Sequence, residues 1–383
     1  MGNGIWGKIL TNISSSFSYL SLSLYRYSSL ARWPTYRGFD SFYGYLNGFI
    51  DPFTKTYLDY FDLHSGENQV DHADEIDGSL HTAFLFQAKV EEALSYHNAN
   101  HNAEPMFLYY ATQLMHWPYN APSTYTERCA GKSLAKDESI YCSFNLMLDE
   151  AIANLTCALS DYGMLDNTVF ILASDNGGEE SIQGDSYPFR GHKYDFNRGG
   201  LSANAFITST LIPEDRRGST YAGQMHVVDW LPTIMNLVTE GSWTGSYGGN
   251  STVVDGVDMW DAVVYGLDSP RHEMVHFVNR VGRGSYQYDM YKLDSYFDEY
   301  TLADFEEVSM VFPEDYAPDF SYYSCSNPTV AGSDDSSSRG TSSEPLETKM
   351  YDAFFSIRST SLYFWASVLC VAAVVGSMLV VKV

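Results

Sequence analysis

The most informative stretch of the chain is Thr168-Val169-Phe170-Ile171-Leu172-Ala173-Ser174-Asp175-Asn176-Gly177-Gly178. Its apolar half predicts a buried strand, because a short apolar run bounded by turn residues is typical of one. Asp175 and Asn176 follow at the carboxyl end of that strand. Open α/β sheets bind ligands at this edge, and carboxylate and amide oxygens suit a hard divalent cation. Taken alone, the same residues would also fit an ordinary Asp-Asn-Gly turn.

The flanking elements predict an α/β fold. A strand is expected at 106–111, followed by a helix in which Phe144, Met147, Ala151 and Leu155 recur at helical spacing and which Gly163 closes. Strand, helix and strand form a βαβ unit, which implies a largely parallel sheet. Further elements are predicted as helices at 80–97 and 227–238, a strand at 201–209, and an antiparallel hairpin of 274–279 with 284–292 in a small C-terminal subdomain.

Composition excludes one class of partner. The 383 residues carry a net charge of −26, from 22 basic and 48 acidic residues, which argues against nucleic acid. Five cysteines lack metal-site spacing. Cys129 and Cys142 flank a polar loop and are a candidate disulfide, while Cys157 is expected to be a buried thiol. Asn12, Asn154 and Asn250 stand in Asn-x-Ser/Thr sequons and are glycosylation candidates.

The C-terminus predicts membrane attachment. Leu362 to Val381 holds no charged residue and is long enough to span a bilayer core. A transmembrane or anchor segment is therefore expected at 361–383, behind a polar stalk at 332–360. It would serve either as a single-pass anchor or as a cleaved lipid-anchor signal. Both alternatives place the folded domain on the luminal or extracellular side.

Two further side chains complete a candidate site. His116 follows the end of the predicted 106–111 strand, and Lys193 lies in Phe189-Arg190-Gly191-His192-Lys193, one loop beyond Asp175 and Asn176. The carboxyl ends of parallel strands open on the same side of a sheet. An imidazole, an ammonium group and a cation-binding pair in one crevice suit an oxyanion ester substrate.

At this point the chain resembles the sulfatases, in particular their arylsulfatase B-like branch. The motifs that carry the resemblance occur in order from about residue 37 to 280. They are Arg37-Gly38-Phe39-Asp40, Tyr43-Gly44-Tyr45-Leu46, Leu108 to Pro122, Met147-Leu148-Asp149-Glu150, Asn167-Thr168-Val169-Phe170, Asp175-Asn176-Gly177-Gly178, Pro188 to Lys193, Gly199-Gly200, Val228 to Thr233, Asp255-Gly256-Val257-Asp258 and Ser269-Pro270-Arg271.

The resemblance implies a calcium-dependent sulfuric ester hydrolase acting on a substrate such as a sulfated polysaccharide. It implies that Asp175 and Asn176 bind Ca²⁺, and that His116 and Lys193 contact the sulfate. The implied fold is an alkaline-phosphatase-like mixed sheet flanked by helices, with a small C-terminal α+β subdomain. In this sequence the catalytic domain would span 37–240 and the subdomain 241–331, after an atypical segment at 1–36.

The chain departs from the family at its nucleophile. Sulfatases use a formylglycine made from Cys or Ser in a Cys/Ser-x-Pro-x-Arg sequence near the N-terminus. No Cys precedes Cys129, and the first metal-binding Asp pair is also missing. The expected Gly-Lys-Trp-His segment is absent too, since no Lys lies between Lys8 and Lys55 and no His precedes His64. Covalent catalysis then lacks its reacting atom, so the sequence as written is expected to be inactive.

Three interpretations stay open at this stage. The first is a sulfatase represented by an N-terminally truncated sequence. The second is a membrane-tethered pseudo-sulfatase that binds sulfated glycans or a protein partner without turnover. The third is a phosphatase or phosphodiesterase of the same superfold, which would need an upstream Thr or Ser nucleophile and a second metal cluster.

Overall fold

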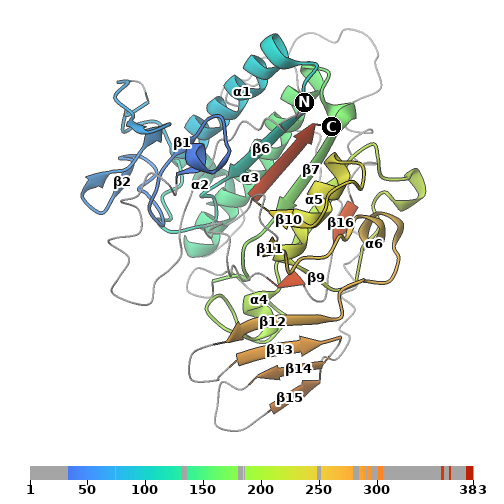
Figure 1. The fold of residues 1–383 in the computed structure, drawn as a ribbon. Helices are drawn as coiled ribbons and strands as arrows, with labels where there is room; N and C mark the ends of the chain where they lie inside the picture. Colours follow the sequence, from blue (N-terminus) through green and yellow to red (C-terminus); the bar gives the residue numbers. More distant parts are fainter. Residues whose placement is uncertain are drawn as a thin grey trace.

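The structure is a computed structural model that describes residues 33–73, 75–130, 136–179, 184, 186–247, 252–278, 284–289, 291–294, 301–304, 355–357, 362–363 and 377–382. Within these ranges helices pack on both faces of a central sheet, and a smaller antiparallel sheet lies at one end (Figure 1). The predicted α/β class is therefore confirmed.

The central sheet has five strands in the order β16-β8-β7-β18-β6. They are β6 (Met106–Ala111), β7 (Thr168–Ala173), β8 (Ala205–Thr208), β16 (Phe355–Ile357) and β18 (Ser377–Lys382). The predicted strands at 106–111 and 168–173 are β6 and β7. Each described ladder of this sheet is antiparallel, so the largely parallel sheet was wrong. β6 and β7 do run in the same direction, but β18 lies between them.

Two apolar cores cover the two faces of β7. Phe170 belongs to a core with Leu108, Tyr110 and residues of α1 and α3. Val169 and Ile171 belong to the other, with Ile207 and residues of α5 and α6. Alternate residues of a strand point to opposite faces. Burial on both faces explains why β7 is continuously apolar rather than alternating.

The helices follow from the apolar spacing. The helix predicted at 80–97 is α1 (Thr82–His101), and the one closed by Gly163 is α3 (Lys136–Asp161). His81 caps α1 by accepting a hydrogen bond from Ala83 N at 3.1 Å. The remaining helices are α2 (Ser123–Ala130), α4 (Arg198–Leu201), α5 (Trp230–Val238) and α6 (Trp260–Tyr265), with short 3₁₀ turns at Pro34–Arg37, Leu165–Asn167, Glu214–Arg216 and Val227–Asp229.

The C-terminal run differs from its prediction. Of the expected membrane helix at 361–383, the structure describes β17 (Leu362–Tyr363) and β18, both strands. β18 pairs along its whole length with β6 and with β7, and Val381 is 2 % exposed. An apolar run rich in Val is compatible with a buried strand as well as with a helix. Here the available pairing partners, β6 and β7, favour the strand. Among the described residues, none of the helices is both long and apolar enough to cross a membrane.

The smaller sheet is built from β12 (Glu273–Val278), β13 (Gly284–Tyr288), β14 (Tyr291–Asp294) and β15 (Thr301–Asp304), in chain order. β12 and β13 form the predicted antiparallel hairpin. The other described strands are short: β1 (Tyr43–Gly44), β2 (Thr56–Tyr57), β3 (Tyr60–Phe61), β4 (His64–Ser65), β5 (Asn68–Gln69), β9 (Met225–His226), β10 (Ser246–Tyr247) and β11 (Thr252–Val253).

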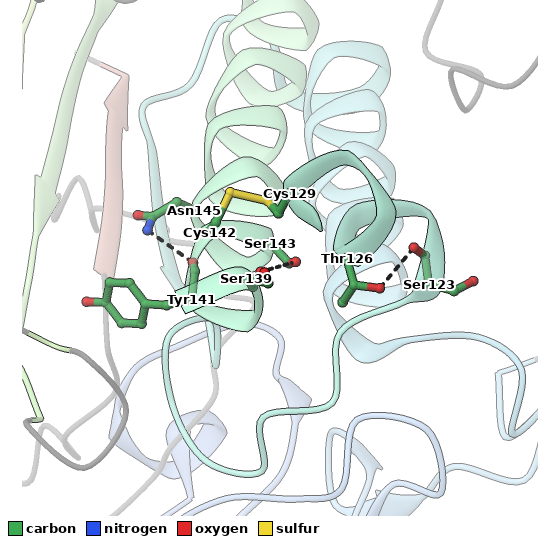
Figure 2. Close-up of a disulfide and its surroundings, with 8 residues drawn as sticks. All are labelled: Ser123, Thr126, Cys129, Ser139, Tyr141, Cys142, Ser143 and Asn145. Carbon is green, nitrogen blue, oxygen red and sulfur yellow. Dashed lines mark hydrogen bonds between the residues drawn. A yellow bond between two sulfur atoms is a disulfide. The ribbon is translucent and has the colours of Figure 1, made fainter. Parts of the chain in front are cut away.

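A disulfide joins α2 to α3. Cys129 and Cys142 are bonded across the intervening loop, as predicted (Figure 2). Cys157 is also disulfide-bonded, so its expectation as a free thiol was wrong. Of the three sequons, Asn154 lies part-buried on α3, while Asn12 and Asn250 fall outside the described residues.

Candidate functional site

The loop after β7 is held by close contact between backbones. Gly177 N donates to Gly200 O at 3.0 Å, and a Cβ on Gly177 would overlap Gly199 O. The Gly177-Gly178 and Gly199-Gly200 pairs therefore belong to one packing contact. Ser174 Oγ donates to Asn176 O, and Asn176 Nδ2 donates to Gly177 O. These bonds fix Asp175 and Asn176 at the carboxyl end of β7.

Asp175 carries a buried oxygen that lacks a partner in the described structure. Its Oδ1 is out of contact with solvent and makes no hydrogen bond. Burial raises the pKa of the Asp175 carboxyl to about 6, and the charge of Lys193 acts in the opposite direction. A buried carboxylate oxygen without a donor is costly, and a cation at this position would offset that cost.

Lys193 is buried within the same loop system. It is 7 % exposed, and its backbone N donates to Gly178 O at 2.8 Å. Its Nζ lies 3.5 Å from Glu179 Oε2 and 5.4 Å from the centre of the Tyr194 ring. The ammonium group is thus anchored beside Asp175 and keeps a single carboxylate partner at ion-pair distance among the described residues.

His116 reaches the same place from β6. Its Nδ1 donates to Trp117 O at 2.7 Å, since a carbonyl can only accept, so Nε2 carries the lone pair in the neutral ring. Burial lowers the pKa of His116, and Lys193 lowers it further. The electrostatic coupling shows that the structure brings together His116 and Lys193, which lie 77 positions apart in the sequence.

The arrangement is suited to an anion. A buried ammonium group and an imidazole meet where two strands of the same direction end, and Glu179 is the negative group beside them. An oxyanion ester placed there would replace Glu179 as the partner of Lys193. Donors fixed in advance in a water-poor crevice stabilise such charge more strongly than donors in water.

The described residues fit a calcium ion only in part. The unpartnered Oδ1 of Asp175 and the neighbouring amide of Asn176 are hard oxygen ligands. Calcium takes 6–8 oxygen ligands. Within the described part of the chain no group of three or more His, Cys, Asp or Glu side chains could hold a metal ion. The pair thus supplies part of a site, and no catalytic step is derived through the ion.

A separate groove of about 740 Å³ lies at the other end of β6. Glu104 and Pro105, which precede β6, line it together with Tyr43, Lys89 and Tyr96. Lys89 in this groove is ion-paired with Glu75 and Glu92, and His101 Nδ1 lies 3.3 Å from Glu104 Oε1. His116, Asp175 and Lys193 are not among its lining residues, so the groove is distinct from the candidate site.

Sequence reasoning missed three features of this region. Glu179 was not singled out, although it directly follows the Gly177-Gly178 pair in the sequence. The expectation that the chain holds no Ser-x-Pro-x-Arg pattern anywhere was wrong, because Ser186-Tyr187-Pro188-Phe189-Arg190 has this pattern. Ser186 Oγ accepts a hydrogen bond from Gly178 N at 3.1 Å. It thereby closes the loop that carries Lys193.

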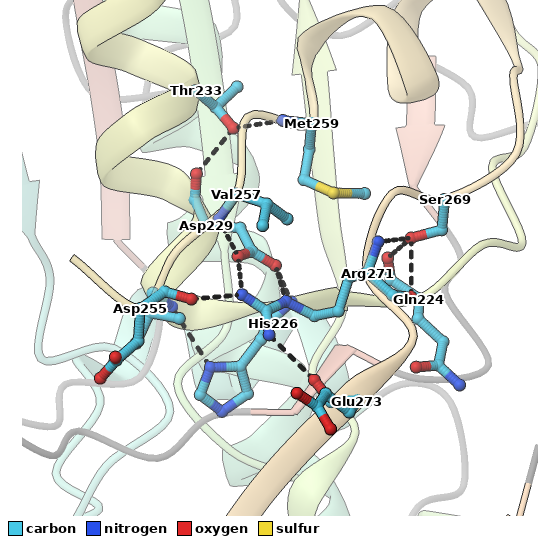
Figure 3. A network of polar contacts seen from close by, with 11 residues as sticks. Gln224, His226, Asp229, Thr233, Asp255, Val257, Met259, Ser269, Arg271 and Glu273 are labelled. Atoms are coloured by element: carbon cyan, nitrogen blue, oxygen red, sulfur yellow. Dashed lines mark hydrogen bonds and ion pairs between the residues drawn. The ribbon is translucent and has the colours of Figure 1, made fainter. Parts of the chain in front are cut away.

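The third missed feature is a buried ion pair between Asp229, the residue before α5, and Arg271, which lies just before β12. Arg271 Nε and Nη2 donate to the two carboxylate oxygens of Asp229, at 2.7 and 2.5 Å (Figure 3). Asp229 is fully buried and also accepts from His226 N and Val257 N. Two of the matched motifs, which contain Asp229 and Arg271, are thus parts of one contact.

Comparison with known proteins places this geometry in a family. The sulfatase family model matches residues 8–240, which extends the resemblance from residue 37 back to residue 8. Arylsulfatase J of Mus musculus is 33 % identical over 254 residues, which are 65 % of this chain and 40 % of that protein. Arylsulfatase A of Homo sapiens is 33 % identical over 82 residues, 21 % of this chain and 15 % of that protein. The chain therefore spans well under half the length of these relatives.

A solved structure supports the fold. The structure of Ps i-CgsB in complex with k-i-k-neocarrahexaose aligns with a TM-score of 0.62 at 17 % identity, over 78 % of this chain and 65 % of that one. Ps i-CgsB without the saccharide gives the same TM-score of 0.62 at 18 % identity, with the same coverage of both chains. Because the family model covers more than half of the chain, the protein belongs to the sulfatase family.

Proposed function

We propose that His116, Asp175 and Lys193 together bind the sulfate group of a sulfuric ester, as in an arylsulfatase-type hydrolase. The observation that carries this proposal is the buried Lys193 ammonium group, electrostatically coupled to His116 at the shared end of β6 and β7. Membership of a family whose relatives are named arylsulfatases supports the same reaction class.

Each residue has a distinct part in this proposal. Lys193 neutralises the non-bridging sulfate oxygens. The substrate then replaces Glu179 as the ion-pair partner of Lys193. His116 Nε2 faces the sulfate as a proton acceptor when neutral and as a donor when charged. A bound anion would raise the pKa of His116 from its lowered value, because an opposite charge favours the imidazolium form.

We assign Asp175 and Asn176 as two ligands of a Ca²⁺ ion whose remaining ligands lie elsewhere. When bound, such an ion would polarise the sulfate as a Lewis acid. For the chain itself, the consequence is that Asp175 would remain ionised despite its burial. The unpartnered Oδ1 is the observation that supports this assignment.

A sulfated saccharide is the substrate class we favour. The structural relative Ps i-CgsB has been solved with a neocarrahexaose, so this fold accommodates an extended sugar chain in that protein. The strongly acidic composition again argues against nucleic acid as a partner.

The alternative is a pseudo-sulfatase that binds sulfated glycans, or a protein partner, without turnover. Within the sequence as written, Ser186 is the one residue with the sequence context of a formylglycine precursor. Its hydroxyl oxygen, however, is engaged by Gly178 N. We therefore propose that the sequence as written binds sulfate esters without hydrolysing them.

For location we propose a luminal or extracellular domain. The Cys129–Cys142 disulfide favours an oxidising compartment. Attachment to a membrane through Leu362–Val381, as a single-pass or lipid anchor, remains part of the proposal. It would require β18 to leave the central sheet, since the same residues cannot serve in both places.

Binding of 4-nitrocatechol sulfate tests the site directly. Calorimetric titration of the purified chain, in calcium buffer, should give one site, and Lys193→Met should weaken it at least about tenfold. Lys89→Met is the matched control, because Lys89 is also ion-paired but lies in the separate groove. Equal affinities for the wild type and Lys193→Met would rule out the assigned sulfate position.

A further inference from the structure

Aromatic side chains flank both residues assigned to the sulfate. Trp117 directly follows His116, and Tyr194 directly follows Lys193. We propose that Trp117 and Tyr194 form a stacking platform that receives the sugar ring of a sulfated saccharide beside the sulfate position. The inference rests on the proposed function and adds to it the part of the site that recognises the sugar.

Trp117 is exposed yet fixed in place. Its side chain is 49 % exposed, and its ring meets the Phe49 ring edge to face with centroids 4.5 Å apart. Phe49 in turn stacks on His116 at 6.4 Å and packs against Tyr57 at 5.0 Å. An indole held by an aromatic cluster loses little freedom when a ligand covers it, which favours binding.

Tyr194 is held outward by its backbone. It is 75 % exposed, and its φ of 78° lies in the left-handed region, which is strained for a residue with a Cβ. Met115, which precedes His116, has a similar φ of 74°. Each assigned sulfate contact therefore adjoins a strained residue, and such strain is concentrated at ligand-binding positions.

The polar groups beside the platform match a sugar rather than a plain aromatic ligand. Glu179 and Tyr194 both lie close enough to Tyr119 to interact electrostatically with its hydroxyl group. Sugar rings combine apolar C–H faces, which stack on aromatic rings, with hydroxyls that need polar partners. Pockets of this mixed kind bind through a few convergent polar groups on an apolar wall.

Three probes separate the two parts of the site: galactose 6-sulfate, galactose and methyl sulfate, each titrated by calorimetry into the full chain in calcium buffer. Trp117→Ala and Tyr194→Asn should each weaken galactose 6-sulfate about tenfold and leave methyl sulfate within about twofold. Asn is chosen because it tolerates a positive φ. Trp117→Phe should restore most of the affinity, and Tyr265→Ala, a half-exposed tyrosine on α6, is the control.

The outcomes are distinguishable. Unchanged galactose 6-sulfate affinity in both variants, with methyl sulfate still dependent on Lys193, would overturn the platform alone. Equal losses for galactose 6-sulfate and methyl sulfate would also overturn it, because Trp117 would then only support His116. Methyl sulfate binding that is indifferent to Lys193→Met would overturn the proposed function together with the platform.

Discussion

Asp229 and Arg271 are joined by a buried bidentate ion pair that links the N-terminus of α5 to the segment leading into the smaller sheet. The Asp229 side chain has no exposure, and that of Arg271 has 10 %. The pair is also hydrogen-bonded to its surroundings, because Arg271 donates to Glu273 O and Asp255 O. Buried charges persist only when they are paired and hydrogen-bonded in this way.

Asp229→Asn should therefore destabilise the protein by about 3–5 kcal/mol, since an amide nitrogen would face a donor and Arg271 would keep an uncompensated charge. Urea unfolding measures the change. Arg128→Ala is the control, because the Arg128–Glu150 pair is partly exposed and such pairs contribute about 0–1 kcal/mol. Similar losses of unfolding free energy in the two variants would show that the buried pair stabilises the protein no more than an exposed one.

Because His81 is buried, we expect the protein to lose stability in acid. Burial lowers the pKa of His81 to about 4, while an unfolded histidine titrates near 6.5. The unfolded state therefore binds more protons below pH 6.5, and stability falls as the pH drops from about 6.5 to about 4. The full effect is at most about 3 kcal/mol.

His81→Asn keeps a side-chain acceptor for Ala83 N at the start of α1 and removes the titrating group. The pH dependence of the unfolding free energy in this window should then become shallower than in the wild type. An identical pH profile for the two proteins would show that His81 is not buried as a neutral ring.

Val381 tests whether the C-terminal run is a strand of the sheet. Val381→Asp places a carboxylate between β6 and β7 in the apolar core, so the melting temperature should fall sharply, with a cost above about 3 kcal/mol. Thermal melts of the two proteins measure the change. An unchanged melting temperature, combined with loss of binding to lipid vesicles, would instead show that Leu362–Val381 acts as the anchor.

How far the sequence predicts this molecule depends on whether a signal is local. The bounds of β6 and β7 follow from short apolar runs, and the Cys129–Cys142 bond from two cysteines around one loop. The position of β18 could not be predicted, because an apolar run is compatible with helix and strand, and its partners lie more than 200 positions away. The ion pair of Lys193 with Glu179 was missed for a different reason: the two residues are near in sequence, but the packing of their loop decides that they meet.

Calcium binding should depend on Asp175. Addition of Ca²⁺ should raise the melting temperature, because a ligand of the folded state stabilises it by mass action. Asp175→Asn should abolish that shift and, without calcium, should be neutral or stabilising, because it removes the charge of a buried carboxylate whose Oδ1 lacks a partner. A shift that persists in Asp175→Asn would place the ion elsewhere.

Aryl sulfate turnover by this chain, produced together with a formylglycine-generating enzyme, separates binding from catalysis. We expect tight, Lys193-dependent binding of 4-nitrocatechol sulfate and no release of 4-nitrocatechol above the buffer rate. Turnover above that rate would contradict this expectation. Ser186→Ala would then identify the reacting residue, since loss of that turnover would assign the nucleophile to Ser186, the one Ser-x-Pro-x-Arg serine of the sequence.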